Sequence, residues 1–218
     1  MCSSDLLLER VQQSLGGAGK LAAVKDLQYQ ADVEVQSPSG QGMQVKQTNS
    51  YLFPATMRQE IVLPFGKQSM YSNGTSGWLA GMQGVRDLPP PVLGQVRGEV
   101  FRQILGLTLS DRDSNRTVTY SGDGVLDIFT KSGERAQLQV DEKTGMPLKL
   151  SYQEASAGVH SRVAGSVEQI YSDWRDVGGV RLPFQWTVLQ GGKKYAEVKV
   201  QDYKLNSGLT EDTLSKKP

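Results

Sequence analysis

The chain has 218 residues, of which 38% are hydrophobic and 22% charged, a composition typical of a globular protein and not of a fibre or a disordered chain. The 24 lysines and arginines nearly balance the 23 aspartates and glutamates, so charge gives no basis for binding nucleic acid or an acidic membrane. No run approaches the roughly 18 apolar residues that span a bilayer, and no transmembrane segment is expected.

Residues 1–25 are predicted to form N-terminal helices. Leu6, Leu7, Val11 and Leu15 share one stripe, and Gly16 follows as an end signal. The segment lacks the basic start and the apolar run of a signal peptide. Cys2 leaves two interpretations open: a lipid-modified N-terminus like that of mature bacterial lipoproteins or, as the favoured one, an ordinary thiol.

A period of two begins at residue 27 and predicts half-buried strands. The first strands are expected over 27–81, with turns at Pro54, at 64–66 and at Asn73-Gly74. An antiparallel meander is expected over 115–205, followed by a tail over 206–218. Altogether about 10–11 short strands at hairpin spacing are indicated, and so many must curl. The fold class is therefore predicted as mainly β with a few helices: a single curved antiparallel sheet, an unclosed half-barrel covered by helices, in one domain of residues 1–218.

Residues 89–107 interrupt the strand pattern after three consecutive prolines and predict a helix. Its apolar stripe must be buried, and the hollow of the sheet is the expected place. Gly94 and Gly98 each cost about 1 kcal/mol in a helix interior relative to alanine, so this helix depends on docking. A movable lid and a permanent plug are both open interpretations. The predicted lid residues are Val92, Val96, Val100, Phe101 and Ile104.

Apolar side chains on the predicted strands exceed what a thin half-barrel core needs, and they are candidates for lining a ligand pocket. Core packing is the alternative for each of them. The predicted lining consists of Phe53, Met57, Ile61, Leu63, Met70, Trp78, Phe129, Leu148, Leu150, Phe184 and Trp186.

Residues suited to catalysis are scarce. His160 is the only histidine and lies in a small-residue loop, and Cys2 is the only cysteine. Metal sites built on several His or Cys residues are therefore excluded, and no cofactor is expected. Carboxylates such as Asp127 and Asp202 fall on polar strand faces and are expected to be solvated. No catalytic residue can be named, so the protein is expected not to be an enzyme.

Three motifs and the order of the elements carry a resemblance to a known family. They are "FPATMRQE" around the Pro54 corner, "NGTSGW" from Asn73 to Trp78, and "GGVRLPF" from Gly178 to Phe184. The chain resembles, over nearly its whole length, the LolA/LolB-like superfamily of periplasmic lipoprotein carriers and receptors. The last motif is also similar to modules fused to insulinase-type zinc peptidases, although no H-x-x-E-H motif is present here.

The resemblance implies an unclosed β-barrel whose hollow, covered by helices, accepts acyl chains. Two departures concern function. Phe53 stands where the carriers place an arginine that latches the lid, and the loop at 37–42 is polar where the receptors carry an apolar hairpin.

Two functions from different classes follow. The first is a monomeric periplasmic binding protein, exported and with Cys2 as a candidate lipid anchor, that holds a lipid, a lipoprotein acyl chain or another apolar ligand. The second is an accessory domain without a ligand, associated with an envelope protein or a fused peptidase domain. A glycan-processing enzyme is a weaker third, because no catalytic pair of carboxylates stands out.

Overall fold

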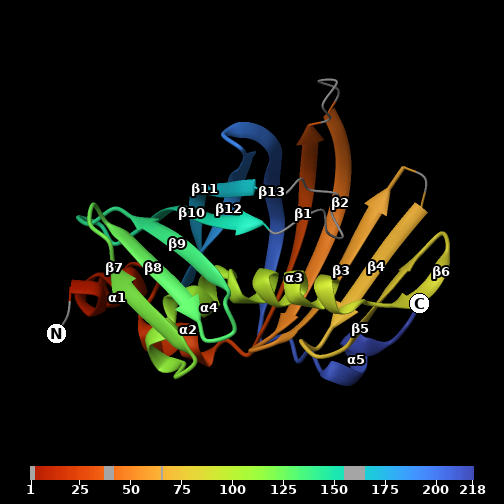
Figure 1. Cartoon of the computed structure of the whole chain (residues 1–218), viewed down its shortest axis with the longest axis horizontal. Coiled ribbons are helices and arrows are strands. Elements are labelled where there is room, and N and C mark those ends of the chain that lie inside the picture. The colour runs from red at the N-terminus through yellow and green to blue at the C-terminus, as the bar shows by residue number, and fades with distance from the viewer. Residues whose placement is uncertain (1–2, 37–41, 65, 155–164) are drawn as a thin grey trace. The chain divides into compact units, whose positions relative to one another are not determined.

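The computed structural model describes residues 3–36, 42–64, 66–154 and 165–218. Its 13 strands form one antiparallel sheet with the order β6-β5-β4-β3-β2-β1-β13-β12-β11-β10-β9-β8-β7 (Figure 1). The sheet does not close on itself, since β6 and β7 are its free edges. The predicted fold class is thereby confirmed, with 13 strands in place of the expected 10–11. The contacts within the chain divide it into two compact units.

Unit 1 contains Met1–Ala23 and Arg102–Tyr195. Its helices are α1 (Ser3–Ser14), α2 (Ala18–Ala23) and α4 (Ile104–Thr108), with a short 3-10 helix η1 (Ser110–Arg112). Its strands are β7 (Arg116–Tyr120), β8 (Val125–Thr130), β9 (Arg135–Val140), β10 (Pro147–Glu154), β11 (Gly165–Val177) and β12 (Val180–Gln190). Leu126, Leu138 and Leu150 lie directly opposite one another on β8, β9 and β10, and all three are fully buried. They form the centre of the core of this unit.

Helix α1 packs with a slightly different face from the predicted one. Leu7, Val11 and Leu15 are buried as expected, but Leu6 is 47% exposed and Leu8 takes its place in the core. The N-terminal part is fixed by backbone contacts with the strands. A side chain at Gly16 would meet the carbonyl oxygen of Gly179 at 2.2 Å, so only glycine permits this approach.

Asp127 in β8 corrects the expectation of a solvated carboxylate, because it is only 5% exposed. Its carboxylate accepts hydrogen bonds from Ser121, from Arg135 Nη2 at 3.1 Å and from Gln137 Nε2 at 3.0 Å. Burial raises the pKa of Asp127, but these hydrogen bonds and the Arg135 charge outweigh burial and leave the pKa below its ordinary value. A buried carboxylate with three donors is a structural element of unit 1.

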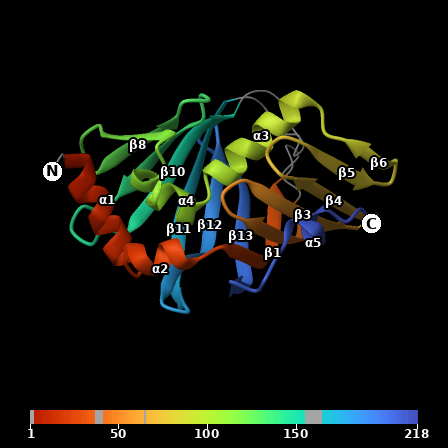
Figure 2. The same cartoon turned by 90° about the horizontal axis from the view of Figure 1, so that it is seen from below.

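Unit 2 contains Val24–Phe101 and Ala196–Pro218. Its strands are β1 (Asp26–Gln36), β2 (Gly42–Leu52), β3 (Thr56–Leu63), β4 (Gly66–Ser72), β5 (Gly77–Gly81), β6 (Gly84–Asp87) and most of β13 (Lys193–Leu205). Two helices belong to it, α3 (Pro90–Phe101) and α5 (Glu211–Ser215), and both are visible beside its strands in Figure 2. Strand β6 and helix α5 were not predicted: β6 has only four residues, and the expected tail over 206–218 contains α5.

The predicted helical segment 89–107 is two helices. Helix α3 ends at Phe101 in unit 2, and α4 begins at Ile104 in unit 1, where it contacts α1. Gln12 of α1 donates a hydrogen bond to the carbonyl oxygen of Thr108 at 2.9 Å. Ile104 therefore belongs to another unit than the other predicted lid residues, and α3 is the part of the segment that can cover unit 2.

Candidate functional site

The sheet of unit 2 has two faces that are covered by different helices. Directly opposite residues of an antiparallel pair point to the same side, so the register defines each face. One row crosses seven strands of this unit without a register shift and consists of Tyr203, Tyr29, Asn49, Gln59, Met70, Leu79 and Arg86. We call the side that carries this row the α3 face and the opposite side the α5 face.

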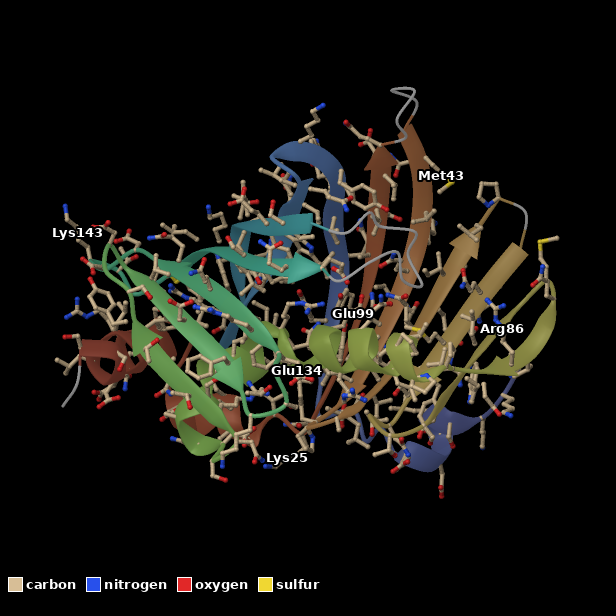
Figure 3. All side chains as sticks on the ribbon, viewed as in Figure 1. Lys25, Met43, Arg86, Glu99, Glu134 and Lys143 are labelled. Carbon is tan, nitrogen blue, oxygen red and sulfur yellow. The ribbon has the colours of Figure 1, made fainter. Side chains whose placement is uncertain are left out.

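Helix α3 covers part of the α3 face. Val96, Val100 and Phe101 are between 2% and 5% exposed, so the helix buries its apolar stripe as predicted. Glu99, labelled in Figure 3, is close enough to Tyr29 to act on it electrostatically. Burial raises the pKa of Tyr29 above its ordinary value; a hydrogen bond with Tyr51 lowers the pKa in part, and the charge of Glu99 adds a smaller increase.

Aromatic side chains surround Tyr29 on this face. The ring of Tyr29 lies 6.3 Å from that of Tyr51 and 5.4 Å from that of Tyr203, and Tyr51 stacks in turn on Phe53 at 6.4 Å. Such offset contacts stabilise a rigid apolar wall. Phe53, predicted to line the hollow, thus extends an aromatic cluster at the α3 face.

Two buried amides lie at the centre of the same row. Gln59 Nε2 donates a hydrogen bond to Asn49 Oδ1 at 2.8 Å. Asn49 is 1% exposed, and its Nδ2 atom has no hydrogen-bond partner among the described residues. The α3 face therefore carries polar groups among apolar ones, a pattern common in ligand sites.

A cavity of about 260 Å³ opens on the α3 face near the ends of β3, β4, β5 and β6. Gly66, Gly81 and Gly84 line it and contribute no side chains, and a Cβ atom placed at Gly81 or Gly84 would meet nothing within 4 Å. The space thus exists because three glycines meet there. The apolar part of its lining is Leu63, Leu79 and Met82.

The cavity also has a cationic side. Arg86 lines it from the α3 face together with two glutamines, and no carboxylate is among the described lining residues. Lys67 also borders it, but it lies opposite Val62, so its side chain is on the α5 face. Lys67 is paired with Glu60 at 2.8 Å. The Arg86 side chain has no hydrogen bond or ion pair with any residue that the structure describes, and Figure 3 shows Arg86 beside β4, β5 and β6.

Trp78 differs from its prediction, because it lies on the α5 face and not with Met57 and Met70. Its partners are Tyr71 across the strand pair and Leu214 of α5. Its ring nitrogen donates a hydrogen bond to the carbonyl oxygen of Ser215 at 2.9 Å. Both faces of β5 carry a large apolar side chain, Trp78 on one and Leu79 on the other, so the residue type did not identify the face.

Arg58 completes the attachment of α5. Its guanidinium lies 5.3 Å from the Trp78 ring centre and donates hydrogen bonds to the carbonyl oxygens of Leu214 and Lys216 at 2.9 and 2.7 Å. It also pairs with Glu60 at 2.9 Å. Tyr71 donates a hydrogen bond to Glu211 at 3.0 Å, and burial, followed by this carboxylate, raises the pKa of Tyr71 to about 12. The α5 face is a packed structural surface.

Four further predicted lining residues share the α3 face of unit 2. Met57, Ile61 and Leu63 alternate along β3, and Met70 lies opposite Gln59 on β4. Met57 and Met70 are buried, whereas Ile61 and Leu63 are half-buried and Leu63 lines the cavity. The four residues therefore share one face, and of them Leu63 lines the cavity.

The other five predicted lining residues belong to unit 1. Leu150 is a fully buried member of its core. Phe129 and Leu148 are 36% and 45% exposed. Phe184 and Trp186 are half-buried on β12, and the Phe184 ring lies 4.5 Å from the Arg175 guanidinium. A ligand-binding role for these five remains a prediction.

Sequence reasoning missed Arg86 and the three glycines as parts of the site. The alternation of β5 could have indicated the glycine side of the site, because Leu79 and Gly81 fall on one face of the strand and Trp78 and Ala80 on the other. Of the lid residues, Val96, Val100 and Phe101 are buried in α3, Val92 is half-buried near its start, and Ile104 is in α4.

Within the described residues, no group of three or more His, Cys, Asp or Glu side chains is placed to hold a metal ion. His160, Cys2 and most of the polar loop at 37–42 lie outside the described residues. No helix in the described part of the chain has the length and apolar character needed to cross a membrane.

Comparisons with solved structures support the predicted resemblance at the level of the fold. A LolA superfamily protein from Nitrosomonas europaea matches 99% of this chain and 99% of its own, with a TM-score of 0.66 and 11% sequence identity. A protein of the DUF1329 family from Desulfovibrio piger gives 0.63 over 98% and 100%, with 12% identity. A proposed outer membrane lipoprotein-sorting protein domain from Vibrio parahaemolyticus gives 0.60 over 97% of each chain, with 9% identity. No family model matches the sequence, and no curated protein is similar to it in sequence.

Proposed function

We propose that this protein is a non-enzymatic binding protein of the bacterial envelope, which holds the hydrocarbon chain of a lipid or lipoprotein on the α3 face of unit 2. The observation that carries the proposal is the glycine-lined cavity with Leu63 and Leu79 on that face. Apolar pockets with a few polar groups are the usual form of small-molecule sites. The likeness in fold to a LolA superfamily protein and to a proposed lipoprotein-sorting domain adds support and favours a periplasmic location.

The energetics suit a carrier that also releases its ligand. Each methylene group buried from water contributes about 0.8 kcal/mol, so a long chain gains roughly 10 kcal/mol before any opposing term. Helix α3 already buries Val96 and Val100 on the same face. Moving it to admit a chain would expose these residues and offset part of the gain, which leaves a moderate affinity.

The test uses two neighbouring residues of β3 that point to opposite faces. Ile61 lies on the α3 face one row from the Leu79–Arg86 pair, and Val62 is 52% exposed on the α5 face. Uptake of a fluorescent long-chain fatty acid is measured by titration. We expect saturable binding that Ile61→Asp weakens at least tenfold, because the ligand chain would have to desolvate a carboxylate. Val62→Asp introduces the same charge and should bind as the parent protein does.

Circular dichroism and thermal unfolding of both variants separate loss of binding from loss of structure. A folded parent protein that takes up no fatty acid would favour the second candidate, an accessory domain whose apolar residues serve only packing. The observation that favours this second candidate is the deep burial of Val96, which is 2% exposed.

A further inference from the structure

Arg86 is placed as the terminal residue of the cross-strand row on the α3 face. It lies directly opposite Leu79, which lies opposite Met70, which lies opposite Gln59. Its side chain lines the 260 Å³ cavity and has no partner among the described residues. The guanidinium is thus available to a ligand at the same place where the glycines leave space.

The charge of the cavity is one-sided. Of its two charged lining residues, Lys67 has its side chain on the α5 face, where it pairs with Glu60 from the neighbouring strand. Arg86 therefore supplies the positive charge on the α3 face of the cavity. Arg86 is an exposed residue, and an anionic group bound beside it would supply a counter-charge that a neutral ligand lacks. Guanidinium groups recognise carboxylates and phosphates with two parallel hydrogen bonds.

The size of the cavity limits what it holds. Pockets that enclose a drug-sized ligand usually have volumes of about 300–1,000 Å³, so a cavity of about 260 Å³ suits a head group and the first part of a chain. The rest of a chain would follow the row toward Met70 and α3. Neighbouring strands are about 4.8 Å apart, so the five strand spacings from Arg86 to Tyr29 span roughly 24 Å. Gln59, Asn49 and Tyr29 on this row are buried, so a chain reaches them only if α3 moves.

We propose that the cavity binds the anionic head, a carboxylate or phosphate, of a single-chain amphiphile through Arg86, with the chain directed over Leu79 toward Met70. This inference rests on the proposed function and adds the chemical class of the ligand. It assigns Arg86 a role in choosing between charged and neutral amphiphiles, not in holding the chain.

The test compares dodecanoate with its neutral counterpart dodecanol by calorimetric titration at low salt, below the concentrations at which either aggregates. We expect the parent protein to bind dodecanoate about tenfold more tightly, as for one charge-assisted hydrogen-bonded pair. Arg86→Gln should remove most of this preference, so that the ratio of the dodecanoate and dodecanol affinities falls toward one. The control Lys46→Gln removes one positive charge from an exposed position on the α5 face and should change neither affinity.

A second experiment fills the cavity with a side chain. Gly81 has ordinary strand geometry, and a Cβ there has open space, so Gly81→Val should fold and weaken both ligands. Acetate tests whether a free anion alone suffices, and we expect it not to displace dodecanoate at equal concentration. Equal binding of the two ligands, an Arg86→Gln variant that keeps the preference, or displacement by acetate would each overturn the inference while leaving the proposed function intact. If neither dodecanoate nor dodecanol binds the folded parent protein, the proposed function fails as well.

Discussion

Trp78 and Leu79 are neighbours in β5, and their side chains lie on opposite faces of the sheet. Leu79 borders the cavity, whereas Trp78 contacts Leu214 and donates a hydrogen bond to Ser215. The sequence indicates that both are strand residues with large apolar side chains. It does not indicate which face binds a ligand, because the covering helix α5 comes from residues more than 130 positions later.

For Trp78→Ala, we therefore expect a loss of stability and not a selective loss of binding. Removing a buried aromatic side chain costs about 3–5 kcal/mol, and α5 loses its main apolar contact. Denaturant unfolding gives the free energy, and hydrogen exchange over 209–216 reports release of the helix. Trp78→Phe keeps the ring contact and should cost much less. A Trp78→Ala variant that is as stable as the parent but no longer binds fatty acid would contradict this and would identify Trp78 as a ligand-binding residue.

Asp127 is expected to make the stability of unit 1 depend on pH in the acid range. Its pKa is lowered in the folded state by hydrogen bonds from Ser121, Gln137 and Arg135, which outweigh the opposing effect of burial. Its stabilising contribution is therefore complete above the unfolded value of about 3.9 and is lost as pH falls through the lower folded-state pKa. At neutral pH, Asp127→Asn should reduce the free energy of unfolding by about 1–3 kcal/mol.

This difference between Asp127→Asn and the parent should shrink below pH 4, as followed by denaturant unfolding at several pH values. Asp123→Asn is the control, since Asp123 is an exposed loop residue at φ 49°, a conformation that asparagine also adopts. A constant difference between parent and Asp127→Asn at every pH would show that the carboxylate charge does not stabilise the fold.

At the scale of the elements, α3 is the part whose behaviour decides how a ligand enters. Its apolar stripe was predictable because Val92, Val96 and Val100 recur every four residues after the prolines. Its end was not predictable, since nothing in the local pattern separates Phe101 from Ile104. The helix ends there because the next residues pack with α1 in unit 1.

Gly94→Ala distinguishes a movable lid from a permanent plug. A Cβ at Gly94 would meet only the end of the flexible Arg97 side chain, at 3.5 Å, so alanine should stabilise α3 by about 0.5–1 kcal/mol. If α3 must loosen before a ligand enters, association of a fluorescent fatty acid should slow several-fold in stopped-flow measurements. Gly19→Ala in α2, where a Cβ has open space, is the control. Unchanged association in Gly94→Ala would identify α3 as a plug.

Across the whole molecule, the alternation of apolar and polar residues along the strands accounted for most of the correct prediction of the fold. It identified a mainly antiparallel open sheet, the N-terminal helices and the turn at Asn73-Gly74, because these depend on local patterns. Strand β6 was missed because four residues are too few to show the alternation of apolar and polar side chains that identifies a strand. The two faces of unit 2 could not be separated, since their identity depends on which helix packs on each.

Local alternation also predicted part of the apolar face that carries the candidate site. Met57, Ile61, Leu63 and Met70 were recognised from their apolar alternation, and they share the α3 face. Arg86 and Gly81 were not recognised, because an exposed arginine and a turn glycine are common in sequences. Their significance comes from the cavity that they line together.

Photo-crosslinking of a fatty acid that carries a diazirine near its end, followed by peptide mapping, tests the central claim most directly. The α3 face of unit 2 should be labelled, with modified residues in β3–β5 at Leu63, Met70 and Leu79 and in α3. Excess unlabelled fatty acid should suppress the labelling. Labelling confined to the α5 face around Val62 and Trp78, or to unit 1, or labelling that competitor does not reduce, would contradict the account.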